Sequence, residues 1–206
     1  MSVPTRSRGQ REDGHPDSRL ARRQRRLEEL LEAAGVVTGA ELDAILDRYL
    51  ATAKPANGAR VVARAWVDEG FRHRLLADGN AAVAELGFSM GGGIQPQLLR
   101  VVENTPRLHN VVVCTLCSCY PLALLGPSPS WYRSEAYRSR VVRRPREVLE
   151  EFGLHLPGHV EVRVWDASAE TRYMVVPRRP AGTEGMAEDA LAGLVTRRGL
   201  IGTAAV

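Results

Sequence analysis

The cysteines of this sequence are gathered in one short segment. The chain contains three of them, Cys114, Cys117 and Cys119, and all lie within six residues. Because a thiolate is both a nucleophile and a metal ligand, three sulfurs at this spacing indicate a chemical site. Their odd number is a poor basis for a disulfide framework. This segment is therefore the strongest candidate for chemistry in the chain.

Familiar metal and redox patterns explain the segment only in part. A zinc site usually has four ligands in two separated pairs, whereas here only His109 lies close to the cysteines. A ferredoxin-type cluster needs a fourth cysteine. A redox Cys-x-x-Cys motif would use Cys114 and Cys117 but would leave Cys119 unexplained. Plain packing of three small hydrophobic residues is the remaining alternative.

The Cys-Ser-Cys spacing allows a compact set of donors. If the chain curls, the sulfurs of Cys117 and Cys119 and the backbone nitrogens of Ser118 and Cys119 can face one point. Cys114 can reach the same point from the preceding turn. These donors would leave one open position on the ion, as hydration chemistry requires. Deprotonated amides call for a metal of high charge, and a trivalent ion would still leave excess negative charge to be compensated.

The length and composition indicate a folded domain that can position such a loop. The chain has 206 residues, of which 44% are hydrophobic and 25% charged. These values exclude wholesale disorder and a fibrous repeat, and the length suits one compact domain with an appendage. No run of about 18 apolar residues occurs, and the N-terminus lacks the apolar core of a secretory signal. We therefore expect no membrane span and a cytoplasmic location.

The basic charge is concentrated at the N-terminus. The net charge is +4, yet residues 1–26 contain eight arginines and three acidic residues. The remainder of the chain is close to neutral. Because a nucleic-acid-binding protein is expected to carry basic charge on its folded body as well, the distribution argues against a nucleic-acid partner. The arginine-rich arm is the only feature that favours one.

We expect the fold class to be α+β, with a helical N-terminal arm followed by a small layered α/β domain. Residues 1–17 should form a flexible basic arm, 18–88 a helical region, and 89–206 an α+β metal-binding catalytic domain. Within the helical region, Thr38 and Glu41 have the spacing of a capping box.

Four short runs in the C-terminal region have the composition of strands. Leu98–Glu103 and Asn110–Val113 are rich in β-branched residues. Glu161–Trp165 and Arg172–Val176 alternate in polarity and predict a hairpin pair. The cysteine segment directly follows the second of these runs. We therefore expect it to be held at the end of a strand.

The segment Cys114–Cys119 reads Cys-Thr-Leu-Cys-Ser-Cys and resembles the metal-binding loop of nitrile hydratase α subunits. We call it the metal-claw loop. The resemblance extends from about Arg60 to Gly202 and includes these segments: Ala59–Trp66, Leu76–Gly79, Val102–Asn104, Tyr137–Pro145, Thr171–Pro177 and Arg179–Gly185. The metal-bearing subunit of thiocyanate hydrolase is similar through the same loop and Pro129–Pro157, and stays as the alternative.

The resemblance implies hydration of a nitrile to an amide at a non-corrin Co(III), or alternatively a low-spin Fe(III). The metal ligands would be Cys114, Cys117, Ser118 and Cys119. Thr115 matches the cobalt type. Cys117 would be oxidised to a sulfinate and Cys119 to a sulfenate, whereas Cys114 would stay a thiolate. Cys117 and Cys119 would be catalytic: either the metal polarises the nitrile, or the Cys119 sulfenate oxygen attacks its carbon, alone or by activating water.

The resemblance also implies partners. A β-type subunit would supply arginines to the oxidised sulfurs and complete the pocket, and a maturation factor would insert the metal. The substrate would be a small nitrile-bearing molecule, with neither a nucleic acid nor a membrane as partner. The further candidates for contact with the substrate or the ligands are Gln95, Thr115, Glu170 and Arg172. For each of them, satisfying polar groups of a loop is the simpler alternative.

The sequence departs from the family beside the loop. Leu122 and Ala123 follow Tyr120–Pro121, where cobalt-type members usually have an aromatic residue. We therefore hypothesise a pocket of altered width, suited to a bulky or heteroaromatic nitrile. A protein that only carries or delivers the metal is a further alternative from a different functional class.

Overall fold

The computed structural model describes residues 16–90, 97–117 and 119–206. These residues form two compact units, the first ending at Arg48 and the second extending from Tyr49 to Val206. The predicted site positions Gln95 and Ser118 lie outside the described residues. Within the described part, no helix is long and apolar enough to cross a membrane.

The first unit consists of helix α1 (Pro16–Ala33) and most of helix α2 (Gly39–Thr52). The predicted capping box at the start of α2 is confirmed. The Thr38 backbone N–H donates to the Glu41 carboxylate at 2.8 Å, and the Glu41 N–H donates to the Thr38 hydroxyl oxygen at 3.3 Å. The hydrogen bonds from Thr38 hold the pKa of Glu41 below its usual value. The local sequence thus fixes where α2 begins.

The second unit begins with three helices: α3 (Pro55–Val67), α4 (Glu69–Ala77) and α5 (Gly79–Glu85). Aspartates separate them. Asp68 accepts a hydrogen bond from the Phe71 N–H at 2.8 Å, and Asp78 accepts one from the Ala81 N–H at 3.0 Å. Because each carboxylate satisfies a donor that the next helix leaves unpaired, the chain stops one helix and starts another within a few residues.

Four strands follow the predicted positions closely: β1 (Leu98–Glu103), β2 (Leu108–Val113), β3 (Glu161–Asp166) and β4 (Thr171–Val176). They form two parallel pairs, β1 with β4 and β2 with β3. The predicted hairpin of β3 with β4 is therefore wrong. After β3 the Ala167 N–H still bonds Val113 at 2.7 Å, whereas Glu170 already accepts from Leu98 at 2.8 Å. The short connection thus transfers the chain from one pair to the other.

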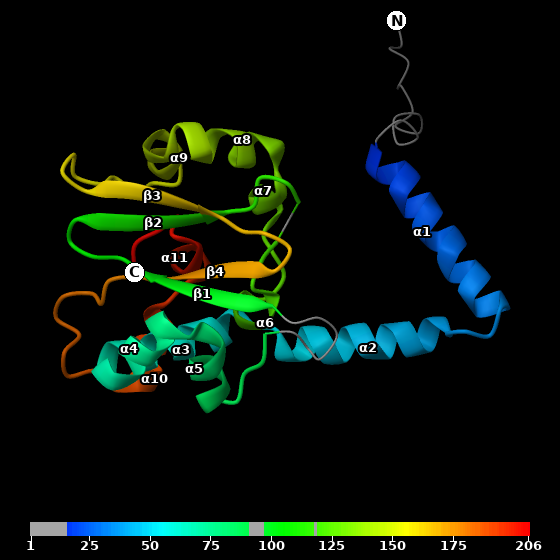
Figure 1. Ribbon diagram of the computed structural model, residues 1–206, viewed down its shortest axis with the longest axis horizontal. Coiled ribbons are helices and arrows are strands. Elements are labelled where there is room, and N and C mark those ends of the chain that lie inside the picture. The colour runs from blue at the N-terminus through cyan, green and yellow to red at the C-terminus, as the bar shows by residue number, and fades with distance from the viewer. Residues whose placement is uncertain (1–15, 91–96, 118) are drawn as a thin grey trace, which may run out of the picture. The chain divides into compact units, whose positions relative to one another are not determined.

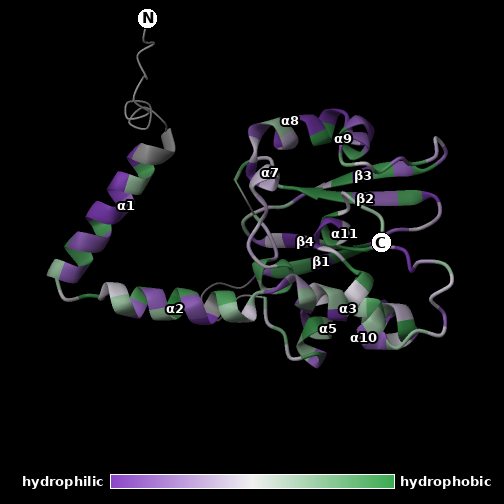
Figure 2. Cartoon of the chain, turned by 180° about the vertical axis from the view of Figure 1, so that it is seen from behind, coloured by the Kyte–Doolittle hydropathy of each residue, from purple (hydrophilic) through white to green (hydrophobic). Residues whose placement is uncertain are grey.

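The remaining elements are short helices: α6 (Leu122–Leu125), α7 (Ser130–Arg133), α8 (Glu135–Arg143), α9 (Pro145–Glu151), α10 (Glu188–Leu194) and α11 (Arg197–Ile201). In Figure 1, α8 and α9 cover the β2–β3 pair, whereas α3, α4, α5 and α10 lie on the far side of the β1–β4 pair. Hydrophobic residues follow the strands between these layers, as Figure 2 shows. The second unit is thus layered and α+β, as predicted.

Helix α11 packs between the layers and requires a glycine at its end. Gly202 has a φ of +87°, and a Cβ there would lie 1.9 Å from the carbonyl oxygen of Asn110 in β2. No other residue could approach the strand so closely in this conformation. The same Gly202 carbonyl accepts a hydrogen bond from the His109 ring at 2.7 Å. The start of β2 is therefore fixed by its contacts with Gly202, the residue directly after α11.

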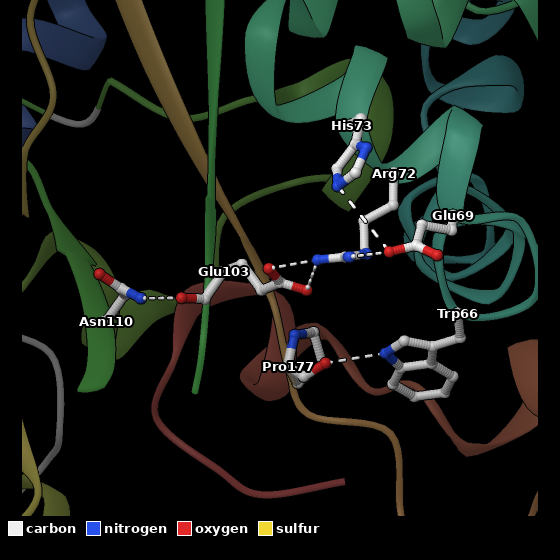
Figure 3. Close-up of polar contacts among 7 residues, drawn as sticks. All are labelled: Trp66, Glu69, Arg72, His73, Glu103, Asn110 and Pro177. Atoms are coloured by element: carbon white, nitrogen blue, oxygen red, sulfur yellow. Dashed lines mark hydrogen bonds and ion pairs between the residues drawn. The ribbon is translucent and has the colours of Figure 1, made fainter. Parts of the chain in front are cut away.

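A network of polar contacts ties the end of β1 to the helical layer (Figure 3). Arg72 of α4 binds the carboxylate of Glu103, the last residue of β1, at 2.9 Å. The Asn110 side chain donates to the backbone carbonyl of Glu103 at 2.8 Å. Trp66 donates from its indole nitrogen to the Pro177 carbonyl at 2.8 Å, just beyond β4. These contacts neutralise the charge and satisfy the polar groups at this end of the β1–β4 pair.

Candidate metal centre

The three cysteines follow β2 directly and differ in exposure. Cys114 comes next after Val113, the last residue of the strand, and is fully buried. Cys119 is 8% exposed, whereas Cys117 between them is exposed to solvent. Leu116, at the outer end of the metal-claw loop, is 89% exposed. The loop is thus anchored at both ends in the protein and presents its middle to the outside.

The structure brings the three sulfurs together. The Cys117 Sγ lies 3.4 Å from the Cys114 Sγ and 3.0 Å from the Cys119 Sγ, and all three lie within 4.8 Å of one another. The Cys117 backbone N–H also points at the Cys114 sulfur, at 3.3 Å. Sulfurs so close can share a single metal ion, and thiolates are the ligands that soft and borderline metals prefer. The chemistry of this donor set therefore fits a metal.

Asp166 fixes the first turn of the loop. In the parallel β2–β3 register Val113 lies beside Asp166, so the carboxylate of Asp166 reaches the residue that follows Cys114. Thr115 donates to it twice, from its backbone N–H at 2.9 Å and from its hydroxyl at 2.6 Å. The predicted site residue Thr115 thus contacts Asp166. Sequence reasoning missed Asp166, although its place directly after the predicted strand Glu161–Trp165 could have drawn attention to it, because functional side chains often lie at the carboxyl ends of strands.

Two buried tyrosines hold backbone carbonyls at either side of the loop. The Tyr132 hydroxyl donates to the Cys119 carbonyl at 3.1 Å, and the Tyr137 hydroxyl donates to the Val112 carbonyl at 2.8 Å. Burial raises the pKa of both phenols well above the usual value, so each hydroxyl keeps its proton and stays a donor. Both residues come from the α7–α8 segment, which sequence analysis assigned no role in the site.

Arg138 of α8 contacts the backbone of the same loop. One guanidinium nitrogen, Nη1, lies 3.3 Å from the carbonyl oxygen of Cys117 and 3.5 Å from that of Thr115. Sequence analysis also missed Arg138, because it stands far along the chain from the cysteines in a stretch with several other arginines.

A cavity of about 370 Å³ opens beside the sulfurs. Its lining residues are Gln97, Cys117, Cys119, Tyr120, Leu122, Ser128 and Arg172. The predicted Arg172 is therefore at the site, and it donates to the Ala169 carbonyl at 2.8 Å. The predicted Glu170 instead accepts from the Ser168 hydroxyl at 3.0 Å. Among the residues that the structure describes, Glu170 is not part of the cavity lining.

The electrostatics of the sulfurs favour a cation between them. Burial, followed by the hydrogen bond to Cys117, raises the pKa of Cys119 to about 12, against the opposing effect of Arg172. A thiol in this environment ionises at neutral pH only if a positive charge compensates it. Three clustered thiolates would also repel one another. A bound metal ion removes both costs, because it supplies the charge and replaces the protons.

The sequence matches the profile of the family described as nitrile hydratase, alpha chain, over residues 18–204. The cobalt-containing nitrile hydratase subunit alpha of Pseudonocardia thermophila is 48% identical over 184 residues, or 89% of each chain. Thiocyanate hydrolase subunit gamma of Thiobacillus thioparus is 48% identical over 164 residues, or 76% of this chain and 68% of that one.

A solved structure of a double mutant of Fe-type nitrile hydratase from Comamonas testosteroni Ni1 has the same fold. It superposes with a TM-score of 0.84 at 42% identity and covers 93% of this chain and 92% of that one. Likeness of this extent in sequence and structure, together with the clustered sulfurs, establishes the relationship. This chain belongs to the nitrile hydratase alpha chain family.

Proposed function

We propose that this chain is the metal-bearing α subunit of a nitrile hydratase, which adds water to a C≡N group and forms the amide. The observation that carries this proposal is the group of three sulfurs within 4.8 Å of one another, of which Cys117 and Cys119 line a cavity. A nitrile has a carbon open to attack by the water oxygen and a nitrogen that takes up both hydrogens of the water. The product is the amide, and no redox change occurs.

Cobalt is the proposed metal, as Co(III). The sulfurs of Cys114, Cys117 and Cys119 would hold it, with the backbone nitrogens of Ser118 and Cys119 as further donors. When bound, it supplies Lewis acidity at one open position. The Thr115 of the cobalt-type loop supports cobalt over iron, as does the name of the Pseudonocardia relative. The Fe-type neighbour keeps iron as an experimental alternative.

The chain's own residues define where the nitrile would bind. Tyr120 and Leu122 form apolar parts of the cavity wall, and Cys117 and Cys119 face the same space. Arg172 places a positive charge there. In the proposed mature protein, Cys117 would be a sulfinate and Cys119 a sulfenate. The sulfenate oxygen would either orient the attacking water or attack the nitrile carbon itself. In the second case a water then releases the amide and restores the sulfenate, and both hydrogens of that water end on the nitrogen. Leu122, in place of the usual aromatic residue, leaves room for a bulky or heteroaromatic nitrile.

A partner subunit would complete this site. The exposed Cys117 and the 89% exposed Leu116 lie on the open side of the loop, where a second chain could cover them. We propose a β-type subunit that supplies arginines to the oxidised sulfurs, and a maturation factor that loads the metal in the cytoplasm, where thiols stay reduced beforehand.

The test is to express the chain with its partner subunit and maturation factor and to analyse the purified assembly. Elemental analysis for cobalt, iron and zinc is expected to give about one cobalt per α chain. The mass of the peptide covering residues 107–133 should show three added oxygens, two on Cys117 and one on Cys119. Amide formation should be measured with acetonitrile and with a cyano-heterocycle, and thiocyanate hydrolysis in parallel.

Each outcome of this test supports or contradicts one of the proposed functions. Amide formation by a cobalt-loaded assembly supports the proposal, whereas a metal-free assembly or one without amide formation contradicts it. Hydrolysis of thiocyanate without hydration of nitriles would instead support the thiocyanate hydrolase alternative. A clear preference for acetonitrile over the cyano-heterocycle would contradict the enlarged pocket alone.

A further inference from the structure

Arg138 is the cation of the α8 helix that contacts the backbone of the metal-claw loop. Its Nη1 lies 3.3 Å from the Cys117 carbonyl oxygen and 3.5 Å from the Thr115 carbonyl oxygen. The side chain is half-buried, and its Nε is buried without a hydrogen-bond partner among the described residues. A guanidinium placed in this way is committed to the loop, because it has given up water to reach it.

The Cys117 carbonyl that Arg138 contacts is bonded directly to one of the proposed metal-binding nitrogens. The Cys117 carbonyl belongs to the peptide bond whose nitrogen is that of Ser118, one of the two proposed backbone ligands. When an amide nitrogen binds a metal as an anion, the resonance that makes the peptide planar shares the negative charge with the carbonyl oxygen. A hydrogen bond from a guanidinium to that oxygen is therefore stronger in the metal-bound form than in the neutral peptide.

The surrounding structure holds Arg138 in place. Tyr137, its neighbour in α8, is 5% exposed, and its hydroxyl binds the Val112 carbonyl at 2.8 Å. The Ser134 hydroxyl caps the start of α8 by accepting from the Tyr137 N–H at 3.2 Å. The helix is thus fixed against the end of β2, so the guanidinium reaches the loop without ordering a flexible segment.

We propose that Arg138 is a positioning residue that stabilises the metal-bound form of the metal-claw loop through the Cys117 carbonyl. This inference rests on the proposed function, since it concerns the same donor set. Three anionic sulfur groups and two amide anions around a trivalent ion would leave excess negative charge. Arg138 compensates part of it from within the chain and from the backbone side of the loop. Arg172 lies on the cavity side of the same sulfurs.

The test compares Arg138→Gln, Arg138→Lys and the control Arg143→Gln in the assembly expressed with its partner and maturation factor. Arg143 is exposed and lies on the same helix beside the same pocket as Arg138. The readouts are the metal content and the rate at which a chelator removes the metal. We expect Arg138→Gln to release the metal about tenfold faster than the wild type. Arg138→Lys should fall between them, and Arg143→Gln should stay within about twofold.

A merely structural tie between α8 and the loop would behave differently. It would lower the thermal stability of the metal-free protein as much as that of the metal-loaded protein, whereas our proposal places most of the loss on the loaded form. Equal metal release from Arg138→Gln and wild type, or equal losses in Arg138→Gln and Arg143→Gln, would overturn it. If Arg138→Gln does not fold, the Arg138→Lys release rate decides by the same criterion.

Failure of this inference and failure of the proposed function are distinguishable. A wild-type assembly without metal or amide formation refutes the function, whatever the variants do. A wild-type assembly that holds cobalt and hydrates nitriles, combined with unchanged metal release from the Arg138 variants, refutes only the role of Arg138.

Discussion

The two parallel strand pairs end in opposite ways. At the end of β1, the carboxylate of Glu103 is bound by Arg72 at 2.9 Å, and both side chains are 27% exposed. At the end of β2, the chain enters a loop with three sulfurs within 4.8 Å of one another. At the first end the carboxylate is thus paired with a cation, within the network in Figure 3. The second concentrates thiols that would ionise together only with a metal ion between them.

The comparison separates an end of the sheet that contributes to stability, at β1, from an end that carries the candidate chemistry, at β2. Both pairs have six-residue strands in parallel register, so the strands alone do not distinguish them. The distinction lies in the residues just beyond each strand. Charged groups that neutralise one another stabilise the fold, whereas buried ligands without a compensating cation remain reactive toward a metal. Mutations at the two ends should therefore affect different measured quantities.

The largest effect is expected from Cys119→Ala. Removing one of three sulfurs from the ligand set should reduce the cobalt content of the assembly at least about tenfold and amide formation by roughly a thousandfold or more. Elemental analysis and an amide assay measure the two quantities. Circular dichroism should show the wild-type fold. Turnover that survives in this variant would contradict the assignment of Cys119.

Arg72→Met is expected to lower the stability of the fold and to leave the metal content unchanged. Loss of Arg72 leaves the half-buried Glu103 carboxylate unpaired and should lower the free energy of unfolding by about 1–3 kcal/mol, measured by urea denaturation. The metal content per folded chain should stay near the wild-type value. The control is Arg163→Met, because its ion pair with Glu161 has side chains 48% and 60% exposed and should contribute less than about 1 kcal/mol. Equal losses of unfolding free energy in Arg72→Met and Arg163→Met would show that the network at the end of β1 contributes no more than an exposed ion pair.

A smaller effect on the metal is expected from Asp166→Ala. The variant removes both hydrogen bonds that Thr115 donates, at 2.9 and 2.6 Å, but leaves every sulfur in place. A looser first turn should make chelator-driven metal release roughly fivefold faster. Asp166→Asn keeps one acceptor and should lie between the two. Metal release unchanged in Asp166→Ala would mean that the sulfurs alone set the shape of the loop.

The smallest expected effect is a pH dependence at the far end of β2. Burial lowers the pKa of His109 below its usual value, despite the opposing hydrogen bond to the Gly202 carbonyl. The unfolded chain therefore takes up a proton first, from about pH 6.5 downward, and the stability present above that pH is lost as the pH falls through the folded pKa. His109→Gln should weaken this decline, and His155→Gln, at an exposed position, should not. Identical slopes of unfolding free energy against pH in His109→Gln and wild type would refute the assignment.

Sequence analysis predicted the local features of this molecule and missed the long-range ones. The capping box of Thr38 and Glu41 is confirmed because all its contacts lie within one turn of chain. The four strands are confirmed as well, but not their pairing. Strand composition says little about partners, and the four residues between β3 and β4 have the length of a hairpin loop although they cross between two pairs.

The candidate site shows the same division. The clustering of Cys114, Cys117 and Cys119 follows from their spacing and could be predicted. The contacts of Asp166 and Arg138 with the loop could not, because they depend on the parallel register of β2 with β3 and on the docking of α8. No pattern near the cysteines encodes either. The resemblance to the family supplied the identity of the chemistry, which spacing alone left open.

The graded exposure of the three cysteines has a consequence for how the proposed centre matures. An oxidant dissolved in water meets sulfur atoms in the order of their accessibility: Cys117 stands outermost, Cys119 is 8% exposed, and Cys114 is sealed in at 0%. The proposed modifications, two oxygens, one oxygen and none, fall in that same sequence. Depth below the surface would thus determine how many oxygens each sulfur receives. The three cysteines would then be modified to different extents without a separate enzyme that recognises each of them.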